Sequence, residues 1–303
     1  MKKYKLIINA IRNGNFFNLL RRKIYIKIFI KSSNAQQIEM QHRTYKKLYN
    51  RYKNIINSHK VTGKQENSNY VWVCWFQGLE NAPDLVKACI NSIKKSLPDR
   101  NIVILTNDNI KDYINFPEYI IKKYEKGIIS KAHFSDLIRI ELLCNYGGIW
   151  IDSTVLCTSP NIPHYILNAP LFVYKVMDLL RTNQMPIVAS SWLISAQSNN
   201  PILSLTRDLL FRYWKEKNYL MDYYLFHIFF TMATRKYKKE WENVPTFNNN
   251  TPHTLMFELG KSYTSERFEQ IKKMSVFHKL ERHTDYSNTK DTMYEYIIKT
   301  YGG

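Results

Sequence analysis

The chain contains few residues of the types that mark several common classes of protein. Four cysteines in 303 residues, Cys74, Cys89, Cys144 and Cys157, are too few for a disulfide-stabilised scaffold and lack the C-x-x-C spacing of a metal site. We therefore expect free thiols in a reducing compartment. Nine glycines and ten prolines exclude collagen-like and linker-like chains.

Acidic residues are also scarce, because 25 Asp and Glu stand against 44 Lys and Arg, which gives a formal net charge of +19. A surplus of this size suits nucleic acid, an anionic membrane surface or a phosphate-bearing substrate as a partner. Hydrophobic residues make up 45% of the chain, near the average for folded soluble proteins, so a disordered protein is excluded.

Long apolar runs are absent from the first thirty residues, where basic side chains interrupt each hydrophobic stretch. We therefore expect neither a membrane-spanning helix nor a secretory signal peptide. Phe16, Phe17, Leu20 and Ile28 recur at roughly helical spacing among the lysines and arginines. This pattern is typical of a helix lying on an anionic membrane surface, and a helix packed on its own domain is the alternative. We expect a cytoplasmic protein, peripheral at the inner face of the cell membrane.

The hydrophobic pattern divides the chain into three parts. Residues 1–67 are expected to form a basic helical N-terminal extension, with Leu48 and Tyr52 on one apolar helical stripe. Residues 68–285 follow a polar break and alternate short uncharged strands with helices. Residues 286–303 are expected to form a C-terminal tail.

The second part opens with a strand, a helix and a strand. The uncharged run 70–75 predicts a buried strand, Pro83 and Asp84 favour the first turn of a helix, and 101–105 predicts another strand. Such a β-α-β unit is the building block of parallel-sheet α/β folds. Later strands are expected at 149–151, 171–174 and 191–196, and later helices at 131–145, 201–215, 221–234 and 268–273.

The stretch 130–154 carries the residues best suited to bind a ligand. Asp136 and Arg139 lie three residues apart on one helix face, where they can pair with each other or jointly hold a polar ligand. Gly147-Gly148 ends this helix. The next strand delivers Asp152 to its carboxyl end, and open α/β sheets bind ligands at that edge.

This stretch resembles the sugar-nucleotide site of bacterial capsular polysaccharide synthesis glycosyltransferases. The resemblance rests on Asp136-Leu137-Ile138-Arg139 followed by Tyr146-Gly147-Gly148-Ile149-Trp150-Ile151-Asp152, and it extends from about Val71 to Leu280. Those enzymes are related to the family 32-like glycosyltransferases that carry an Asp-x-Asp sugar-binding motif. The resemblance implies a GT-A fold, an α/β architecture in which a Rossmann-like sheet flanked by helices binds a nucleoside diphosphate sugar.

The resemblance also implies roles for individual residues in catalysis. Asp136 and Arg139 match helix residues that contact the sugar donor in the family. Asp152 matches the first acid of the Asp-x-Asp motif, and Trp150 matches an aromatic residue just before it. We expect Asp136, Arg139 and Asp152 to form the catalytic centre, with Trp150 beside the donor.

Three further residues are expected to contact the donor. Trp75 and Gln77 follow the first strand, where the family places the nucleobase. An indole can stack on a base and an amide can hydrogen-bond its edge, although a structural role in the core is the alternative for Trp75. Lys279 follows a short apolar run and is expected to contact the phosphates.

A divalent cation is the expected cofactor, because the departing diphosphate gains negative charge that must be stabilised. In the wider family the second acid of the motif commonly contacts the metal, but Thr154 stands at that position here. We expect Asp152, the Thr154 hydroxyl and His278 to hold Mn²⁺ or Mg²⁺ together with phosphate oxygens. An ordinary loop histidine is the alternative for His278.

These observations predict a hexosyltransferase-type enzyme that moves a sugar from a nucleoside diphosphate sugar to a growing capsular or surface polysaccharide. The acceptor would be a polysaccharide or a lipid-linked oligosaccharide. One alternative is a basic nucleic-acid-binding protein, for which 22 Tyr and 15 Phe would stack on bases. No nucleic-acid-binding module is recognisable, so no nucleic-acid partner is expected. Another alternative is an inactive GT-A relative that lost turnover with the second acid.

Overall fold

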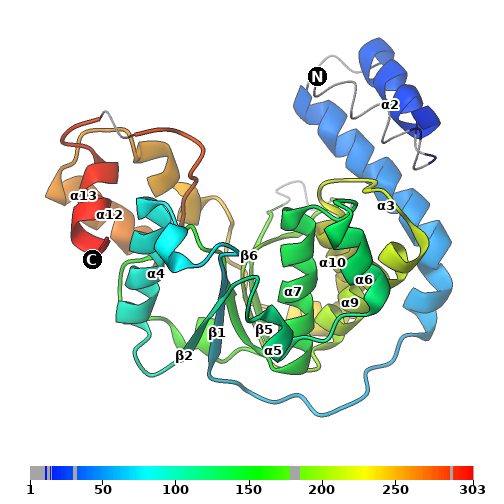
Figure 1. Ribbon diagram of the computed structural model, residues 1–303, viewed down its shortest axis with the longest axis horizontal. Helices are drawn as coiled ribbons and strands as arrows, with labels where there is room; N and C mark the ends of the chain where they lie inside the picture. Colours follow the sequence, from blue (N-terminus) through cyan, green and yellow to red (C-terminus); the bar gives the residue numbers. More distant parts are fainter. Residues whose placement is uncertain are drawn as a thin grey trace.

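A computed structural model describes residues 11, 14, 16–29, 33–177, 185–286 and 289–302. Its centre is a five-stranded sheet in the order β2-β1-β3-β6-β5 (Figure 1). Strand β1 is parallel to β2 and β3, whereas β6 is antiparallel to both β3 and β5. The strands are β1 (Tyr70–Cys74), β2 (Asn101–Leu105), β3 (Gly148–Ile151), β5 (Leu171–Lys175) and β6 (Ala189–Ala196). The predicted α/β class is confirmed, and the GT-A assignment stays a prediction.

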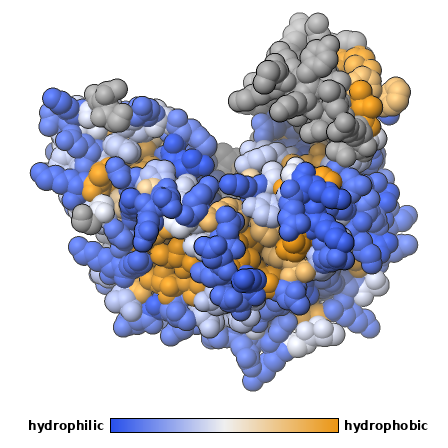
Figure 2. Space-filling view, in the orientation of Figure 1, coloured by the Kyte–Doolittle hydropathy of each residue, from blue (hydrophilic) through white to orange (hydrophobic). Residues whose placement is uncertain are grey.

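Successive strand residues point to opposite sides, so this sheet has apolar side chains on both faces, and helices cover each face. Val71 and Ile149 pack in the core that α4 (Asp84–Ser96) covers, whereas Trp72 and Trp150 pack in the core on the other face. That second face is covered by α7 (Lys131–Asn145), α9 (Pro201–Glu216) and α10 (Leu225–Lys236) (Figure 1). Figure 2 shows mainly hydrophilic side chains around the outside of this face, hydrophobic ones near its centre, and a hollow at the edge of the sheet at which β1 ends.

The other helices lie around these two layers. They are α2 (Phe16–Phe29), α3 (Ser33–Ser58), α5 (Ile110–Tyr113), α6 (Glu118–Glu125), α8 (His164–Leu167), α11 (Lys238–Glu242), α12 (Ser265–Met274) and α13 (Met293–Tyr301), with 3-10 turns η1 (Leu79–Asn81), η2 (Thr251–His253) and η3 (Leu255–Glu258). The helix expected at 221–234 begins at Leu225, because Asp222 Oδ1 accepts from the backbone N–H of Tyr224 and so holds a turn before it.

The N-terminal helices are attached to the main domain along part of their length only. Leu48, Tyr52 and Ile56 of α3 are buried in the core that α9 and α10 share, so the second half of α3 belongs to that core. Helix α2 and the first half of α3 project away from the sheet (Figure 1). Among the described residues, no helix combines the length and the apolar character needed to cross a bilayer.

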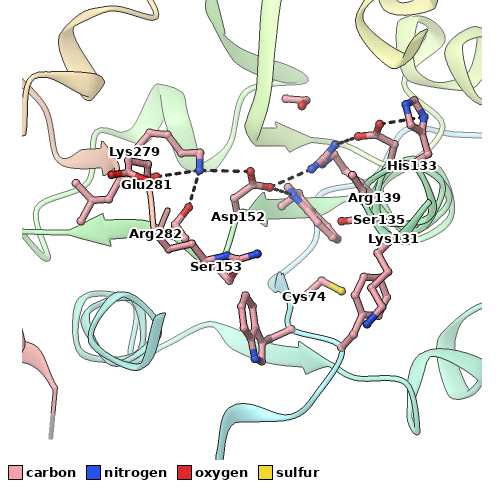
Figure 3. Close-up of a pocket in the computed structure, with 18 of the residues that line it drawn as sticks. Cys74, Lys131, His133, Ser135, Arg139, Asp152, Ser153, Lys279, Glu281 and Arg282 are labelled. Carbon is pink, nitrogen blue, oxygen red and sulfur yellow. Dashed lines mark hydrogen bonds and ion pairs between the residues drawn. The ribbon is translucent and has the colours of Figure 1, made fainter. Parts of the chain in front are cut away.

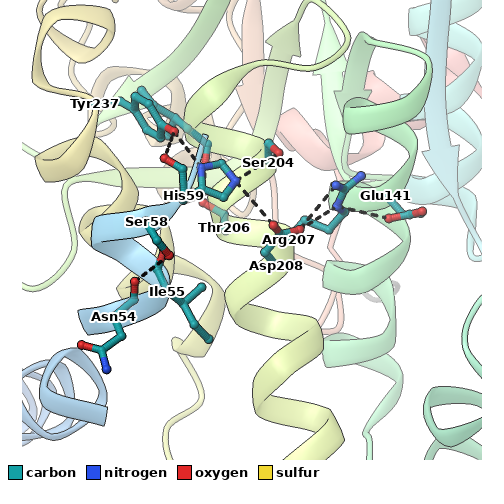
Figure 4. A network of polar contacts seen from close by, with 11 residues as sticks. Asn54, Ile55, Ser58, His59, Glu141, Ser204, Thr206, Arg207, Asp208 and Tyr237 are labelled. Atoms are coloured by element: carbon teal, nitrogen blue, oxygen red, sulfur yellow. Dashed lines mark hydrogen bonds and ion pairs between the residues drawn. The ribbon is translucent and has the colours of Figure 1, made fainter. Parts of the chain in front are cut away.

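A polar network fixes the end of α3 (Figure 4). His59 Nδ1 lies 2.7 Å from the Tyr237 hydroxyl, and His59 Nε2 lies 3.4 Å from Asp208 Oδ2 on α9. Arg207 Nε lies 3.3 Å from Asp208 Oδ1 and 3.9 Å from Glu141 Oε2 on α7. Burial lowers the pKa of His59, so these contacts hold a ring that is neutral near pH 7.

The last part of the chain builds a second small sheet and a third core. Strands β4 (Val155–Cys157) and β7 (Phe277–Lys279) pair antiparallel, with Val155 opposite Lys279. The segment expected to be a tail, 286–303, instead contains helix α13, whose buried Met293 and Ile297 pack in a core with residues of α4. Their apolar spacing of four residues puts both on one helix face, which explains the packing.

Two glycines make the turn between α7 and β3 possible. Gly147 has φ +68° and Gly148 has φ +94°, a region that L side chains rarely adopt. A Cβ at Gly148 would lie 2.4 Å from the carbonyl oxygen of Tyr70 on β1. The close approach lets β3 pair with β1 directly after the helix, which sets the position of Asp152.

The four cysteines are free thiols, as predicted. Burial raises the pKa of Cys74, Cys89 and Cys144 to about 12 and that of Cys157 to about 11. Thiols with such pKa values are almost wholly protonated near pH 7 and are poor nucleophiles.

Candidate functional site

A pocket of about 430 Å³ lies at the carboxyl ends of β1 and β3, in the size range of small-molecule sites (Figure 3). Its lining comes from the loop after β1, the first turns of α7, the end of β3, the start of α10 and the segment after β7. Among the predicted site residues, those that line it are Trp75, Gln77, Asp136, Arg139, Trp150, Asp152, Thr154 and Lys279. His278 does not line it.

The first wall of the pocket is a network of Asp136, Arg139, Trp150 and Asp152, in which Arg139 and Trp150 are buried. One guanidinium nitrogen of Arg139 donates to Asp136 Oδ1, and the other donates to Asp152 Oδ1 at 3.0 Å. Trp150 Nε1 donates to the same Asp152 oxygen at 2.9 Å, and its ring lies 4.7 Å from the guanidinium carbon. The two acids are therefore held by one shared cation.

Each member of the first wall owes its place to a local rule. Asp136 and Arg139 lie three residues apart on α7 and so share one face of that helix. Trp150 and Asp152 lie two residues apart at the end of β3, so both side chains emerge on one side of the sheet. The backbone N–H of Asp152 donates to the Trp192 carbonyl at 2.8 Å, which ties this end of β3 to β6.

The second wall of the pocket consists of Lys279, Arg282 and His283, on β7 and the segment after it. Lys279 Nζ donates to Thr154 Oγ1 at 2.5 Å and to the Leu280 carbonyl at 3.1 Å. The same nitrogen lies 3.9 Å from Asp152 Oδ2, and Figure 3 shows the two side chains pointing toward each other. The second wall thus brings an ammonium group to the open side of Asp152.

The structure corrects the expectation that His278 reaches the site. His278 and Lys279 are adjacent on β7, and neighbouring strand residues point to opposite faces, so only Lys279 enters the pocket. The His278 ring is fully buried, and its Nε2 lies 3.2 Å from the Thr158 hydroxyl. Burial lowers its pKa to about 4, so the ring is neutral near pH 7.

The residues expected to hold Mn²⁺ or Mg²⁺ do not make a fitting set of donors. Asp152 is a single carboxylate, Thr154 already accepts from the ammonium of Lys279, and His278 points elsewhere. Across the described part of the chain, no cluster of three His, Cys, Asp or Glu side chains has the arrangement of a metal site. Hard divalent cations seek several oxygen ligands, and a neighbouring ammonium opposes their charge. Metal use therefore stays a prediction that this donor set does not support.

The two residues expected to contact the nucleobase lie just after the carboxyl end of β1. Trp75 and Gln77 both line the pocket, and the guanidinium carbon of Arg282 lies 5.3 Å from the Trp75 ring centre. Trp75 is half-buried, with its Nε1 buried and without a hydrogen-bond partner. The position suits stacking on a flat ligand, and the role itself stays a prediction.

Several lining residues escaped the sequence analysis. Lys131 lies in the first turn of α7, where the helix dipole favours an anion. Arg282 lies in an irregular segment without a periodic signal, and Tyr223 lies in the turn before α10 that was expected to be helical, so the place of each in the pocket follows only from the tertiary structure. His227 was visible as a histidine among aromatic residues. Burial lowers its pKa to about 4, so it is neutral near pH 7.

Unpaired polar atoms concentrate in this pocket. Seven buried side-chain nitrogen or oxygen atoms of the described residues lack a hydrogen-bond partner, and four belong to residues that line it. Those four are Trp75, His133, Arg139 and His227. Native proteins satisfy most buried polar groups, so these four atoms distinguish the surroundings of the pocket from the rest of the described chain.

The sequence of the chain is similar to those of known proteins. The family model for capsular polysaccharide synthesis proteins matches residues 22–297. A curated relative, the O-glycosyltransferase braB of Annulohypoxylon truncatum, is 33% identical over 104 residues, which are 31% of this chain and 24% of that protein. This chain therefore matches about a quarter of the length of that relative.

A solved structure, the PaToxG glycosyltransferase, aligns with 86% of this chain and 97% of its own at 15% identity and a TM-score of 0.39. The family match covers most of the chain, from the middle of α2 into α13, and includes both walls of the pocket. The chain belongs to the family of capsular polysaccharide synthesis proteins.

Proposed function

We propose that the protein is a glycosyltransferase that moves a sugar from a nucleoside diphosphate sugar to a surface polysaccharide or a lipid-linked oligosaccharide. The observation that carries the proposal is the first wall, in which Arg139 joins Asp136 to Asp152 at the carboxyl edge of the sheet. Ligands of open α/β sheets bind at this edge. The relationship to capsular polysaccharide synthesis proteins and the similarity to an O-glycosyltransferase support the same class of reaction.

The pocket offers a group for each part of such a donor. Trp75 and Gln77 face the base, and the free edges of the two acids face hydroxyl groups of the sugar. The diphosphate meets the first turn of α7 and the cations Lys131, Lys279 and Arg282. In transfer, the bond between the anomeric carbon and the phosphate oxygen breaks, and its electron pair stays on the diphosphate. The acceptor oxygen bonds to that carbon, and its proton is released to water.

The test is a thermal-shift screen of nucleoside diphosphate sugars followed by a transfer assay. A donor at a hundred times its dissociation constant should stabilise the protein by about 2.7 kcal/mol. Asp152→Asn keeps the shape of the side chain but removes the charge that pairs with Arg139, so we expect transfer to fall by about 100-fold or more. Asp108→Asn, an exposed position outside the pocket, is the matched control.

Three results would count against the proposal. If no donor raises the melting temperature, the proposed donor binding is wrong. A donor that binds without release of nucleoside diphosphate, with polysaccharide or lipid-linked oligosaccharide acceptors present, would favour an inactive relative. Equal transfer rates in Asp152→Asn and Asp108→Asn would place the reaction elsewhere.

We also propose that α2 holds the protein on an anionic membrane surface. Phe17, Leu20 and Ile24 are exposed on this helix, and Arg21 lies among them. The described side chains thus combine apolar anchors with positive charge. Ile28 lies in α2, but its side chain is outside the described set. Vesicle sedimentation should show binding to anionic lipid that high salt weakens, and equal binding to neutral vesicles would contradict the proposal.

A further inference from the structure

We propose that the ammonium group of Lys279 takes the place of a divalent metal ion and holds the diphosphate of the donor beside Asp152. This inference rests on the proposed glycosyltransferase function and deepens it. It makes binding of the nucleoside diphosphate independent of metal, in contrast to the expectation from the Asp-x-Asp motif.

The position of the nitrogen carries the argument. Lys279 Nζ lies between Asp152 and Thr154, which occupy the two acid positions of the motif, at 3.9 Å from Asp152 Oδ2 and 2.5 Å from Thr154 Oγ1 (Figure 3). A positive charge already occupies the space that a metal held by these two side chains would need. A metal ion and an ammonium group placed there together would repel each other.

The hydrogen bonds of Lys279 leave capacity for a ligand. An ammonium group has three donors, and Lys279 uses two of them on Thr154 Oγ1 and the Leu280 carbonyl. The distance of 3.9 Å to Asp152 is an ion pair without a hydrogen bond. One N–H thus remains for a phosphate oxygen, and the side chain is 20% exposed and lines the pocket.

Strand pairing makes this position a fixed property of the fold. Val155 lies opposite Lys279 in the β4–β7 pair, and the Leu280 N–H donates to the Thr154 carbonyl at 2.8 Å. These contacts hold the backbone of Lys279 beside that of Thr154. The same strand turns His278 away, so the replacement of the metal by lysine coincides with the loss of an imidazole ligand.

The surrounding charges suit an anion without help from a metal. Four cations line the pocket, Lys131, Arg139, Lys279 and Arg282, against the three carboxylates Asp136, Asp152 and Glu281. Arg139 is committed to two of those carboxylates. The lysines and Arg282 are therefore the groups that a diphosphate can engage.

The test measures binding of UDP, GDP, CDP, ADP and TDP to the full chain by calorimetry, in EDTA and in Mn²⁺. We expect at least one to bind in EDTA with an affinity within about twofold of that in Mn²⁺. Lys279→Met should weaken this binding about 10- to 100-fold, or about 1.4–2.8 kcal/mol. Lys279→Arg should keep most of it, and Lys111→Met, an exposed lysine on α5, should have no effect.

A double variant tests directly whether a metal ion can replace the ammonium group at this position. Thr154→Asp combined with Lys279→Met restores two acids and removes the competing ammonium. We expect this double variant to bind the nucleoside diphosphate at least tenfold more tightly in Mn²⁺ than in EDTA. Should Lys279→Met fail to fold, Lys279→Arg still tests the role of the side chain, and a requirement for Mn²⁺ in the wild-type chain would still overturn the proposal.

Each outcome separates the inference from the proposed function. Binding that requires Mn²⁺, or binding in EDTA that Lys279→Met leaves unchanged, would overturn the role of Lys279 and keep the glycosyltransferase proposal. Failure of all five nucleotides to bind in either buffer would overturn both.

Discussion

The cationic side chains of the two walls of the pocket differ in their exposure and in the partners that they contact. In the first wall, Arg139 is 5% exposed and divides its hydrogen bonds between Asp136 and Asp152, so its charge is used within the protein. In the second wall, Lys279 is 20% exposed and donates to a hydroxyl and a backbone carbonyl, and Arg282 lies over an aromatic ring. The cation of the first wall is therefore paired within the protein, and the cations of the second wall are open to the pocket.

The largest effect on stability is expected from a substitution of Arg139, the cation of the first wall. Arg139→Met leaves two carboxylates without their shared cation in a largely buried place, so the free energy of unfolding should fall by about 3–5 kcal/mol. Lys279→Met should change it by less than about 1 kcal/mol, because neither of its hydrogen-bond partners is charged. Urea denaturation measures both values. Equal losses would mean that the second wall is as structural as the first.

Two buried histidines allow a test of the walls by pH. His227 lines the pocket and His278 lies behind Lys279, and burial lowers the pKa of each from 6.5 to about 4. As the pH falls, the unfolded chain protonates each ring near pH 6.5, whereas the folded chain does so only near pH 4. The free energy of unfolding is therefore highest above pH 6.5 and decreases as the pH falls toward 4. At pH 5 each ring should cost about 2 kcal/mol relative to pH 8.

Glutamine variants separate the two rings. His278→Gln and His227→Gln should each reduce the loss of stability between pH 8 and pH 5, as followed by urea denaturation at the two pH values. At pH 7.5 only His227→Gln should alter the affinity for a nucleoside diphosphate, because only His227 lines the pocket. An equal change in affinity in His278→Gln would show that the back of the second wall also controls the site.

The smallest expected effect concerns Arg282. Its guanidinium lies over Trp75 and makes no ion pair with any acid of the described residues within 4 Å. Arg282→Gln should lower the affinity for a nucleoside diphosphate by about two- to fivefold, the size of an exposed charge pair with a phosphate. The free energy of unfolding should fall by no more than about 1 kcal/mol, the size of an exposed cation–π contact. A loss of affinity as large as that of Lys279→Met would move the main phosphate contact from the strand to the segment after it.

The arrangement of the first wall could be predicted from the sequence because its residues are close together in the chain. Asp136 and Arg139 follow helical spacing, and the glycine pair followed by an uncharged strand places Asp152 at the edge of the sheet. Only the helix, the turn and the strand direction were needed, and all three have local signals. The α/β class followed from the same alternation of strands and helices.

The second wall was only partly within reach. Strands β4 and β7 have three residues each and pair residues 120 to 124 positions apart, so neither their existence nor their register has a local signal. Lys279 was expected near the phosphates, but its contact with Thr154 depends on that register. The error at His278 has the same origin, because adjacent strand residues cannot both enter one pocket. The packing of α13 on α4 likewise depends on tertiary contacts.

The β4–β7 pair also bears on how the protein is made. Residue 155 leaves the ribosome long before residue 279, at rates of about 5–20 residues per second, so the growing chain contains Asp152 and Thr154 for several seconds before Lys279 is added. The nascent protein therefore cannot hold a nucleotide through Lys279 before β7 has been synthesised. Under the proposed role of Lys279, a gain in stability from a bound nucleoside diphosphate is available only to chains that contain β7, so nucleotide supply would favour complete molecules over shortened translation products.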